Sequence, residues 1–407
     1  MSCCLGCRVE TVETLVDFGP QAIGHHFFDG GQSEGTYPIR FGICGACGLA
    51  QLIEPIPAEQ LIPRVDWITY NEPEAHLDLM VDMLRGLPGI GRDSTIAGVT
   101  YKDDTTLRRF RERGYARTWR CDPASDLGIE EQRAGVETIV ARIQAPLVPH
   151  LHARHGVPDA VIVRHILEHT LATGKFLEAF RRMVRPGGYV VFEVPECVRG
   201  FNLLDYTTLW EDHSLYFVEP TFVGTLERNG FNVVRFVRYS AAYENCLVAV
   251  TQSAAVVEPS LVPAVVLQCE IARARAFAEG FAGHRAALRR ELETWRERGR
   301  IFMFGAGHQS VTFLNLMGVA DLIAGVIDDS PRKCGLRMPG SRTPIVGSHV
   351  LAEPDVKLCL LSLGAESEKK VVSKQAAFVE RGGTFASIYP LVRGELLNFA
   401  AGATAIA

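Results

Sequence analysis

The sequence lacks several features that would assign a protein at once to a broad class. It has no run of about 18 uncharged apolar residues, so no membrane span is expected. Its formal net charge of -5 gives no overall attraction to nucleic acid or to an anionic membrane. The opening Met1-Ser-Cys-Cys-Leu5 lacks the basic and apolar segments of a secretion signal. We therefore expect a cytoplasmic protein that binds neither nucleic acid nor a membrane.

Cysteine, by contrast, is plentiful. Eleven cysteines in a cytosolic chain indicate metal ligands or buried thiols rather than a disulfide framework. Four of them form two Cys-x-x-Cys pairs, Cys4 with Cys7 and Cys44 with Cys47. Each pair can direct two thiolates at one ion, and four thiolates complete a tetrahedral zinc site with no open position. The pattern predicts a structural zinc site in a domain of residues 1–55, with metal-free buried thiols as the alternative.

The rest of the chain alternates strand-like and helical segments. At 407 residues it is too long for one hydrophobic core, so we expect two or three domains. The alternation over residues 56–255 predicts a parallel sheet with helices on both faces, and residues 299–407 predict a second α/β unit. Residues 256–298 predict a linking helix. The expected strands are 95–99, 116–121, 160–163, 189–194, 233–237 and 247–250, followed by 300–304, 323–327, 357–363 and 384–388.

Two acid–histidine motifs lie within the first α/β unit. His165-Ile-Leu-Glu-His169 directly follows a strand-like run, and Trp210-Glu-Asp-His213 lies on a later loop. In open α/β sheets, ligands bind at the carboxyl ends of the strands, where we expect both motifs to lie. Histidine suits a general base because its pKa lies near neutrality, and a neighbouring carboxylate can orient its ring.

These motifs, with the segment VRPGGYVVFEVPE at 184–196 and EDHSLYF at 211–217, resemble the sugar C-methyltransferases. That family acts on nucleotide-linked 4-keto deoxysugars. The resemblance implies an α/β protein with a zinc-binding N-terminal segment and a Rossmann-like class I methyltransferase domain that uses S-adenosylmethionine. It also implies a second Rossmann-like domain at the C-terminus, which holds the nucleotide sugar.

The resemblance also implies roles for single residues. It makes His213 the base, supported by Asp212, and it places His169 where the sugar oxygen would be polarised. Tyr70 is the nearest match to a catalytic tyrosine of the family.

Three further residues are expected to contact the nucleotide-sugar substrate. They are Glu211, His308 and Arg342. His308 follows the turn Gly305-Ala-Gly307, which opens a helix and by itself is a weak dinucleotide-binding signal. A helix-capping role for His308 is the alternative.

The cofactor turn departs from the family pattern. In the family, the first strand of the methyltransferase domain ends in an acidic residue and a glycine-rich turn. Here Gly98 stands in place of the acid, Thr100 in place of one glycine and Asp104 in place of another, and each Cβ added at a glycine position narrows the space left for a ligand. Asp122 occupies the position whose acid binds the ribose hydroxyls. We predict a cofactor site of Gly98, Thr100, Asp103 and Asp122.

Three functions stay open at this point. The first is a C-methyltransferase acting on a nucleotide-linked keto-deoxysugar through an enolate formed by a histidine base. The second is an enzyme that keeps the enolate chemistry without methyl transfer, such as an epimerase, dehydratase or lyase. The third is a non-catalytic protein that binds a nucleotide sugar. The sequence makes no prediction of which sugar is bound or of the oligomeric state.

Overall fold

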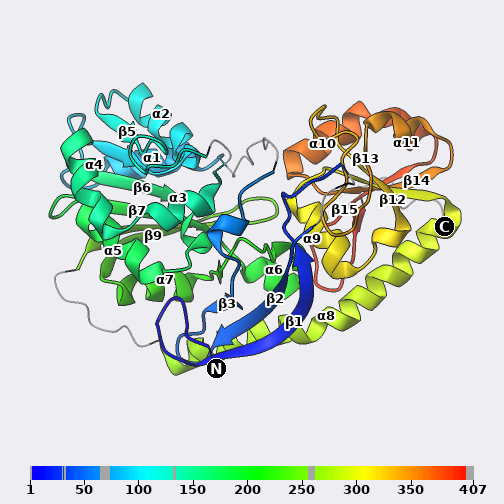
Figure 1. Ribbon diagram of the computed structural model, residues 1–407, viewed down its shortest axis with the longest axis horizontal. Helices are drawn as coiled ribbons and strands as arrows, with labels where there is room; N and C mark the ends of the chain where they lie inside the picture. The colour runs from blue at the N-terminus through cyan, green and yellow to red at the C-terminus, as the bar shows by residue number, and fades with distance from the viewer. Residues whose placement is uncertain are drawn as a thin grey trace. The chain divides into compact units, whose positions relative to one another are not determined.

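The computed structural model describes residues 2–29, 31, 34–64, 74–131, 134–254 and 262–399. The chain divides into two compact units (Figure 1), each assembled from separate stretches of sequence. The first unit comprises Met1–Thr14, Gly42–Cys197 and Asp212–Ala272; the second comprises Leu15–Phe41, Val198–Glu211 and Arg273–Ala407. The chain therefore passes from the second unit to the first inside the predicted active-site motif, between Glu211 and Asp212.

The first unit is built around a six-stranded sheet with the order β5-β4-β6-β7-β10-β9. Neighbours among β5, β4, β6 and β7 pair in parallel, whereas β10 is antiparallel to both β7 and β9. Our expectation of a wholly parallel sheet was therefore wrong for the strand at 247–250. Only residues 240–245 join β9 to β10, and a parallel connection needs a dozen or more residues. The strands are β4 (Ile96–Gly98), β5 (Thr118–Arg120), β6 (Ala160–Arg164), β7 (Tyr189–Pro195), β9 (Phe231–Tyr239) and β10 (Cys246–Ser253).

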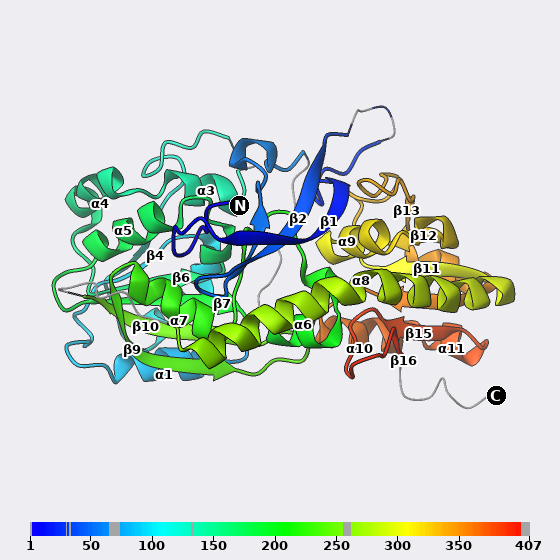
Figure 2. The same cartoon turned by 90° about the horizontal axis from the view of Figure 1, so that it is seen from below.

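Helices cover both faces of this sheet, as the sequence predicted. Successive strand residues point to opposite faces, so Val190 packs into one core and Val191 into the other. Figure 2 shows α1 on one side of the sheet and α4 and α5 on the other. One face is covered by α1 (Leu77–Arg85) and α2 (Asp104–Glu112), and the other by α3 (Val136–Arg142), α4 (Val148–His155), α5 (Thr173–Met183) and α7 (Glu219–Arg228).

A smaller sheet contains the N-terminal strands, in the order β1-β2-β3-β8. Within the first unit, β3 pairs antiparallel with β8, so that Ala50 lies opposite Tyr216 and Gln51 opposite Leu215. The Leu52 amide also donates to the carbonyl of Ser214 at 3.0 Å. The segment that carries Cys44 and Cys47 is thereby tied to the residues just after His213. The strands are β1 (Val12–Ala22), β2 (Thr36–Cys44), β3 (Ala50–Ile53) and β8 (Leu215–Tyr216).

The second unit contains a six-stranded sheet with the order β13-β12-β11-β14-β15-β16. All pairs are parallel except the one between β15 and β16. Its strands are β11 (Arg300–Phe304), β12 (Ile323–Ile327), β13 (Ile345–Val346), β14 (Val356–Leu361), β15 (Thr384–Ser387) and β16 (Asn398–Phe399). Its helices are α6 (Val198–Leu203), α9 (His308–Met317), α10 (Ala365–Lys374) and α11 (Ala376–Glu380). The two α/β units confirm the predicted fold class.

One long helix and several short ones complete the description. Helix α8 (Ala264–Arg298) has 35 residues and contributes to both units. Among the described residues, no helix is long and apolar enough to cross a membrane. The 3₁₀ helices are η1 (Ala58–Gln60), η2 (Tyr101–Asp103), η3 (Ala145–Leu147), η4 (Leu167–His169), η5 (Tyr206–Thr208), η6 (Ala320–Leu322) and η7 (Ser348–Ala352).

Candidate active site and zinc centre

The four cysteines of the two Cys-x-x-Cys pairs come together in the first unit. The Sγ atoms of Cys4 and Cys47 lie 3.7 Å apart, and those of Cys7 and Cys44 lie 3.6 Å apart. A tetrahedron of sulfurs at about 2.3 Å from a zinc ion has edges of about 3.8 Å, so the arrangement fits zinc. Hydrogen bonds from the other three thiols lower the pKa of the Cys44 thiol, which favours the thiolate that a metal requires. The predicted set of four ligands leaves no position for catalysis.

Local backbone geometry explains how each cysteine pair turns. The amide of Arg8 donates to the carbonyl of Cys4, and the amide of Gly48 donates to the carbonyl of Cys44, each at 2.9 Å. Both donor residues adopt a positive φ, 63° at Arg8 and 74° at Gly48. Glycine takes this conformation at little cost, which accounts for Gly48 directly after the second pair.

The two predicted catalytic histidines meet in the first unit. His169 ends η4, just after β6, and its ring centroid lies 4.6 Å from that of His213, edge to face. Ser214 holds the two segments together, because its amide donates to the carbonyl of Glu168 at 2.8 Å and its hydroxyl to that of Thr170 at 2.7 Å. We expected His213 to follow a strand of the large sheet, and this expectation was wrong. His213 lies on the loop before β8 and is positioned by the pairing of β8 with β3.

A third acidic residue, which sequence reasoning missed, completes this cluster. The Oε1 atom of Glu137, in the first turn of α3, lies 2.9 Å from Nδ1 of His169, and both side chains are buried. Burial by itself lowers the pKa of His169, but the Glu137 carboxylate and the charges of Asp212 and Glu168 raise it above its ordinary value of 6.5. No motif marks Glu137, since an acidic residue in the first turn is common in helices generally.

Two atoms of the cluster are buried without a hydrogen-bond partner among the described residues: Nε2 of His169 and Oε2 of Glu168. Buried polar atoms in native proteins nearly always have a partner, so orphaned atoms at one place indicate a polar ligand. Burial also raises the pKa of Glu168, against the charges of His169, His165 and Lys102. The cluster therefore combines His169, whose raised pKa favours the protonated form, with buried polar atoms of His169 and Glu168 that could bind a polar ligand.

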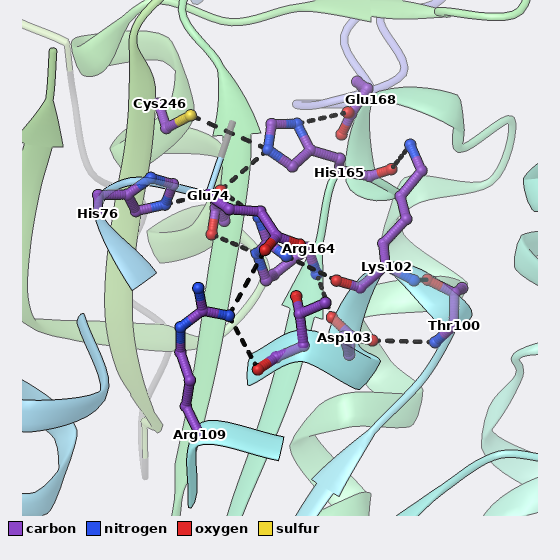
Figure 3. A network of polar contacts seen from close by, with 12 residues as sticks. Glu74, His76, Thr100, Lys102, Asp103, Arg109, Arg164, His165, Glu168 and Cys246 are labelled. Carbon is purple, nitrogen blue, oxygen red and sulfur yellow. Dashed lines mark hydrogen bonds and ion pairs between the residues drawn. The ribbon is translucent and has the colours of Figure 1, made fainter. Parts of the chain in front are cut away.

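Beside this cluster, at the carboxyl ends of β6 and β7, lies a buried ionic network (Figure 3). Arg164 donates to both carboxylate oxygens of Glu193, at 2.7 and 3.2 Å, and Nε2 of His165 lies 2.9 Å from the same carboxylate. Nε2 of His76 lies 3.1 Å from it. Burial alone would raise the pKa of Glu193, but Arg164, His165 and His76 together hold it well below its usual value. Glu193 is thus an ionised, fully buried carboxylate.

Figure 3 also shows Thr100, Lys102 and Asp103 in the turn that follows β4, the predicted cofactor turn. Asp103 is fully buried, and its Oδ2 accepts the amides of Val99 and Thr100 at 2.7 and 2.9 Å. Its Oδ1 accepts the amide of Arg164 at 3.1 Å. A Cβ at Gly98 would lie 2.9 Å from the Cβ of Asp103, so this glycine permits close packing of the turn. Cofactor binding by Gly98, Thr100 and Asp103 stays a prediction. Asp103 would contribute indirectly, because its side chain fixes the shape of the turn.

Just after β5 lies Asp122, the residue predicted to bind the ribose of S-adenosylmethionine. Its side chain is exposed, and Oδ1 accepts both the amide and the hydroxyl of Ser125, at 2.8 and 2.7 Å. These hydrogen bonds lower the pKa of Asp122, so the carboxylate is ionised and can accept further hydrogen bonds from hydroxyl groups. With the orphaned atoms of His169 and Glu168, it gives the first unit polar groups suited to a cofactor and a substrate.

The residues predicted to contact the substrate lie in the second unit. Oε2 of Glu211 lies 2.6 Å from Nε2 of His308, and His25 belongs to the same cluster. Arg342 instead lies on an exposed loop, with its Nε 3.5 Å from a carboxylate oxygen of Glu34. Tyr70 falls within residues 65–73, outside the described residues.

Comparisons with known proteins agree with this organisation. One family model, a zinc binding domain, matches residues 4–61; a second, a methyltransferase domain, matches residues 100–235. A third, the C-methyltransferase C-terminal domain, matches residues 267–390. The C-methyltransferase NovU of Streptomyces niveus is 24% identical over 398 residues, which cover 94% of each chain.

Solved methyltransferase structures are similar to parts of the chain. An O-methyltransferase family protein from Burkholderia thailandensis is 16% identical, with a TM-score of 0.29, over 45% of this chain and 59% of that one. The N-methyltransferase NodS from Bradyrhizobium japonicum, solved with S-adenosyl-L-homocysteine, is 14% identical, with a TM-score of 0.28, over 44% and 87% of the two chains. The three domain matches, in this order along the chain, identify the family. With its zinc-binding, methyltransferase and C-terminal domains, the chain is an S-adenosylmethionine-dependent C-methyltransferase.

Proposed function

We propose that this enzyme methylates the carbon next to the ketone of a nucleotide-linked keto-deoxysugar, through an enolate formed by a histidine base. The observation that carries the proposal is the meeting of His169 and His213, each with an acidic neighbour, beside buried atoms that need a polar ligand. Removal of a proton next to a ketone needs a base near the carbon and a hydrogen-bond donor at the oxygen. Two histidines whose rings are in contact can divide these tasks.

We assign the tasks from the contacts of His169. Glu137 favours the protonated form of His169, which then donates a hydrogen bond through Nε2 to the developing enolate oxygen. His213 takes the proton from carbon, and Asp212 stabilises the imidazolium that results. The electrons of the broken C–H bond form the C–C double bond of the enolate, and the carbonyl π electrons move to the oxygen beside His169.

The methyl donor and the nucleotide have their own predicted contacts. Bound S-adenosylmethionine supplies the methyl group, and Asp122 would hold its ribose hydroxyls. The turn at Gly305 to Gly307, with His308 at the start of α9, is proposed to receive the nucleotide part together with Glu211 and Arg342. The positive end of a helix dipole favours a phosphate at such a position.

Product analysis tests the proposal. The enzyme is incubated with S-adenosylmethionine labelled at the methyl carbon and a panel of nucleotide-linked 4-keto deoxysugars, and NMR locates the label. We expect a new carbon–methyl bond next to the ketone and an equal amount of S-adenosylhomocysteine. If label appears on oxygen or nitrogen, or if no sugar of the panel is methylated, the proposed substrate class is wrong. Proton exchange without methylation would instead favour the epimerase, dehydratase or lyase alternative.

A further inference from the structure

We propose that His25, Glu211 and His308 bind a divalent transition-metal ion in the second unit, separate from the four-cysteine centre. One ligand atom from each of the three residues lies within 4.8 Å of the others. His25 and Glu211 are buried, and His308 is nearly so. Two imidazoles with one carboxylate form a ligand set that zinc and neighbouring first-row ions bind in proteins.

The three residues are held as metal ligands usually are, by a second layer of contacts. The amide of Gly24 donates to Oε1 of Glu211, which orients the carboxylate. The indole of Trp210 stacks on the ring of His308, with centroids 4.5 Å apart and planes at 18°. Trp210 is itself fixed by a 2.9 Å hydrogen bond from Nε1 to the carbonyl of Thr207. These contacts leave little freedom to either side chain.

Gly24 gives a further observation, because its backbone lies very close to the side chains of His308 and Glu211. A Cβ there would lie 2.9 Å from Nδ1 of His308 and 3.0 Å from Oε1 of Glu211. Any residue except glycine would therefore displace the ring of His308 or the carboxylate of Glu211. The backbone packs directly against two of the three proposed ligands.

The alternative to a metal is a simple ion pair between His308 and Glu211, whose nearest atoms are 2.6 Å apart. An ion pair joins two residues, whereas ligand atoms of two buried or nearly buried imidazoles, His308 and His25, lie close to the Glu211 carboxylate. A zinc ion at about 2.0–2.1 Å from each ligand atom accounts for all three, with the ligand atoms about 3.3 Å apart. Binding would need the Glu211–His308 contact to lengthen by several tenths of an ångström.

Three protein ligands leave a coordination position open, as in zinc sites that take up a small ligand. His308 is the first residue of α9, so the ion would lie beside the positive end of that helix. Both features favour an oxygen anion. Resting on the proposed function, we infer that the ion receives a phosphate oxygen of the nucleotide sugar.

Metal analysis tests the site without reference to activity. Wild-type enzyme loaded with zinc and then desalted should retain two ions per chain, whereas His25→Ala and Glu211→Gln should each retain one. The matched control is His26→Ala, which removes the adjacent histidine, a ring neighbour of His25 that is not among the proposed ligands, and should retain two. Glu211→Gln keeps the size of the side chain. If the folded variant loses one ion, the loss is therefore due to the missing carboxylate ligand and not to a change in packing.

Cobalt substitution gives a second measurement that needs no variant. The first equivalent of Co²⁺ should produce the thiolate-to-cobalt charge-transfer band of the cysteine centre. The second should bind with a weaker spectrum typical of nitrogen and oxygen ligands. Binding of one ion only, or retention of two by both His25→Ala and Glu211→Gln, would overturn the proposal. Either result would leave the C-methyl product unaffected, so the metal site and the proposed function fail separately.

Discussion

Replacement of Glu193 by glutamine should destabilise the first unit strongly. The carboxylate is fully buried and accepts two hydrogen bonds from Arg164, whose side chain is 1% exposed. His165 and His76 lie against the same oxygens. The substitution keeps the shape of the side chain but removes the carboxylate charge to which the buried guanidinium of Arg164 donates two hydrogen bonds.

The structure sets the size of the effect. Removal of one partner of a buried ion pair costs about 3–5 kcal/mol, because the remaining charge is not solvated. The matched control is Asp321→Asn, which also converts an acid that pairs with an arginine, Arg289, at 2.6 Å. Those two side chains are 60% and 38% exposed, so this loss should be about 0–1 kcal/mol.

Urea denaturation, with the unfolding of the first unit followed by a local probe, measures both losses. A loss below about 1 kcal/mol for Glu193→Gln would refute the reasoning, since the network would then be solvated or dispensable. The double variant Arg164→Met with Glu193→Leu provides a further check. Because neither residue then leaves a charge behind, it should be more stable than Glu193→Gln.

Three other predictions follow from the site. Cys44→Ser should lose the structural zinc and also lower turnover, because β3 supports the loop of His213 through its pairing with β8. Zinc content and kcat are measured on the same sample, and an unchanged kcat in zinc-free enzyme would contradict the prediction. Asp122→Ala should weaken the binding of S-adenosylhomocysteine roughly 10- to 100-fold in calorimetry, since it removes hydrogen bonds to a charged acceptor; equal affinity would exclude Asp122 as the ribose ligand. Glu137→Gln should lower the pKa of His169, followed by NMR. Because the pKa of His169 is raised in the folded protein, the stability lost in this variant should be largest below pH 6.5 and should shrink as the pH rises through the folded pKa of His169. A stability difference that does not change with pH would contradict the pairing of Glu137 with His169.

Local patterns predicted the parts of the fold that depend on local physics. The runs at 300–304 and 323–327 are the strands β11 and β12, residue for residue, because short apolar runs between turns have few alternatives. The two cysteine pairs predicted their own meeting, since paired Cys-x-x-Cys spacing is typical of a four-thiolate zinc site. The meeting of His169 and His213 was predicted, but its cause was not, because the pairing of β8 with β3 positions His213.

What sequence reasoning missed depends on contacts between distant segments. Glu137 reaches His169 from another helix, and Glu193 is an acid inside an apolar strand whose partner, Arg164, ends the neighbouring strand. Neither has a local signature, because its role arises only from burial beside a charge. The direction of β10 likewise follows from the length of one loop, which periodicity alone did not reveal.

Solvent deuterium exchange at the carbon next to the sugar ketone tests the central claim most directly. The reaction is run in deuterium oxide without a methyl donor and followed by NMR, so that proton removal is seen apart from methyl transfer. Wild-type enzyme should exchange this proton, and His213→Ala should exchange it about 10²- to 10⁴-fold more slowly, the usual contribution of a positioned general base. Exchange by His213→Ala at the wild-type rate would mean that another group removes the proton, and the account of the two histidines would be wrong.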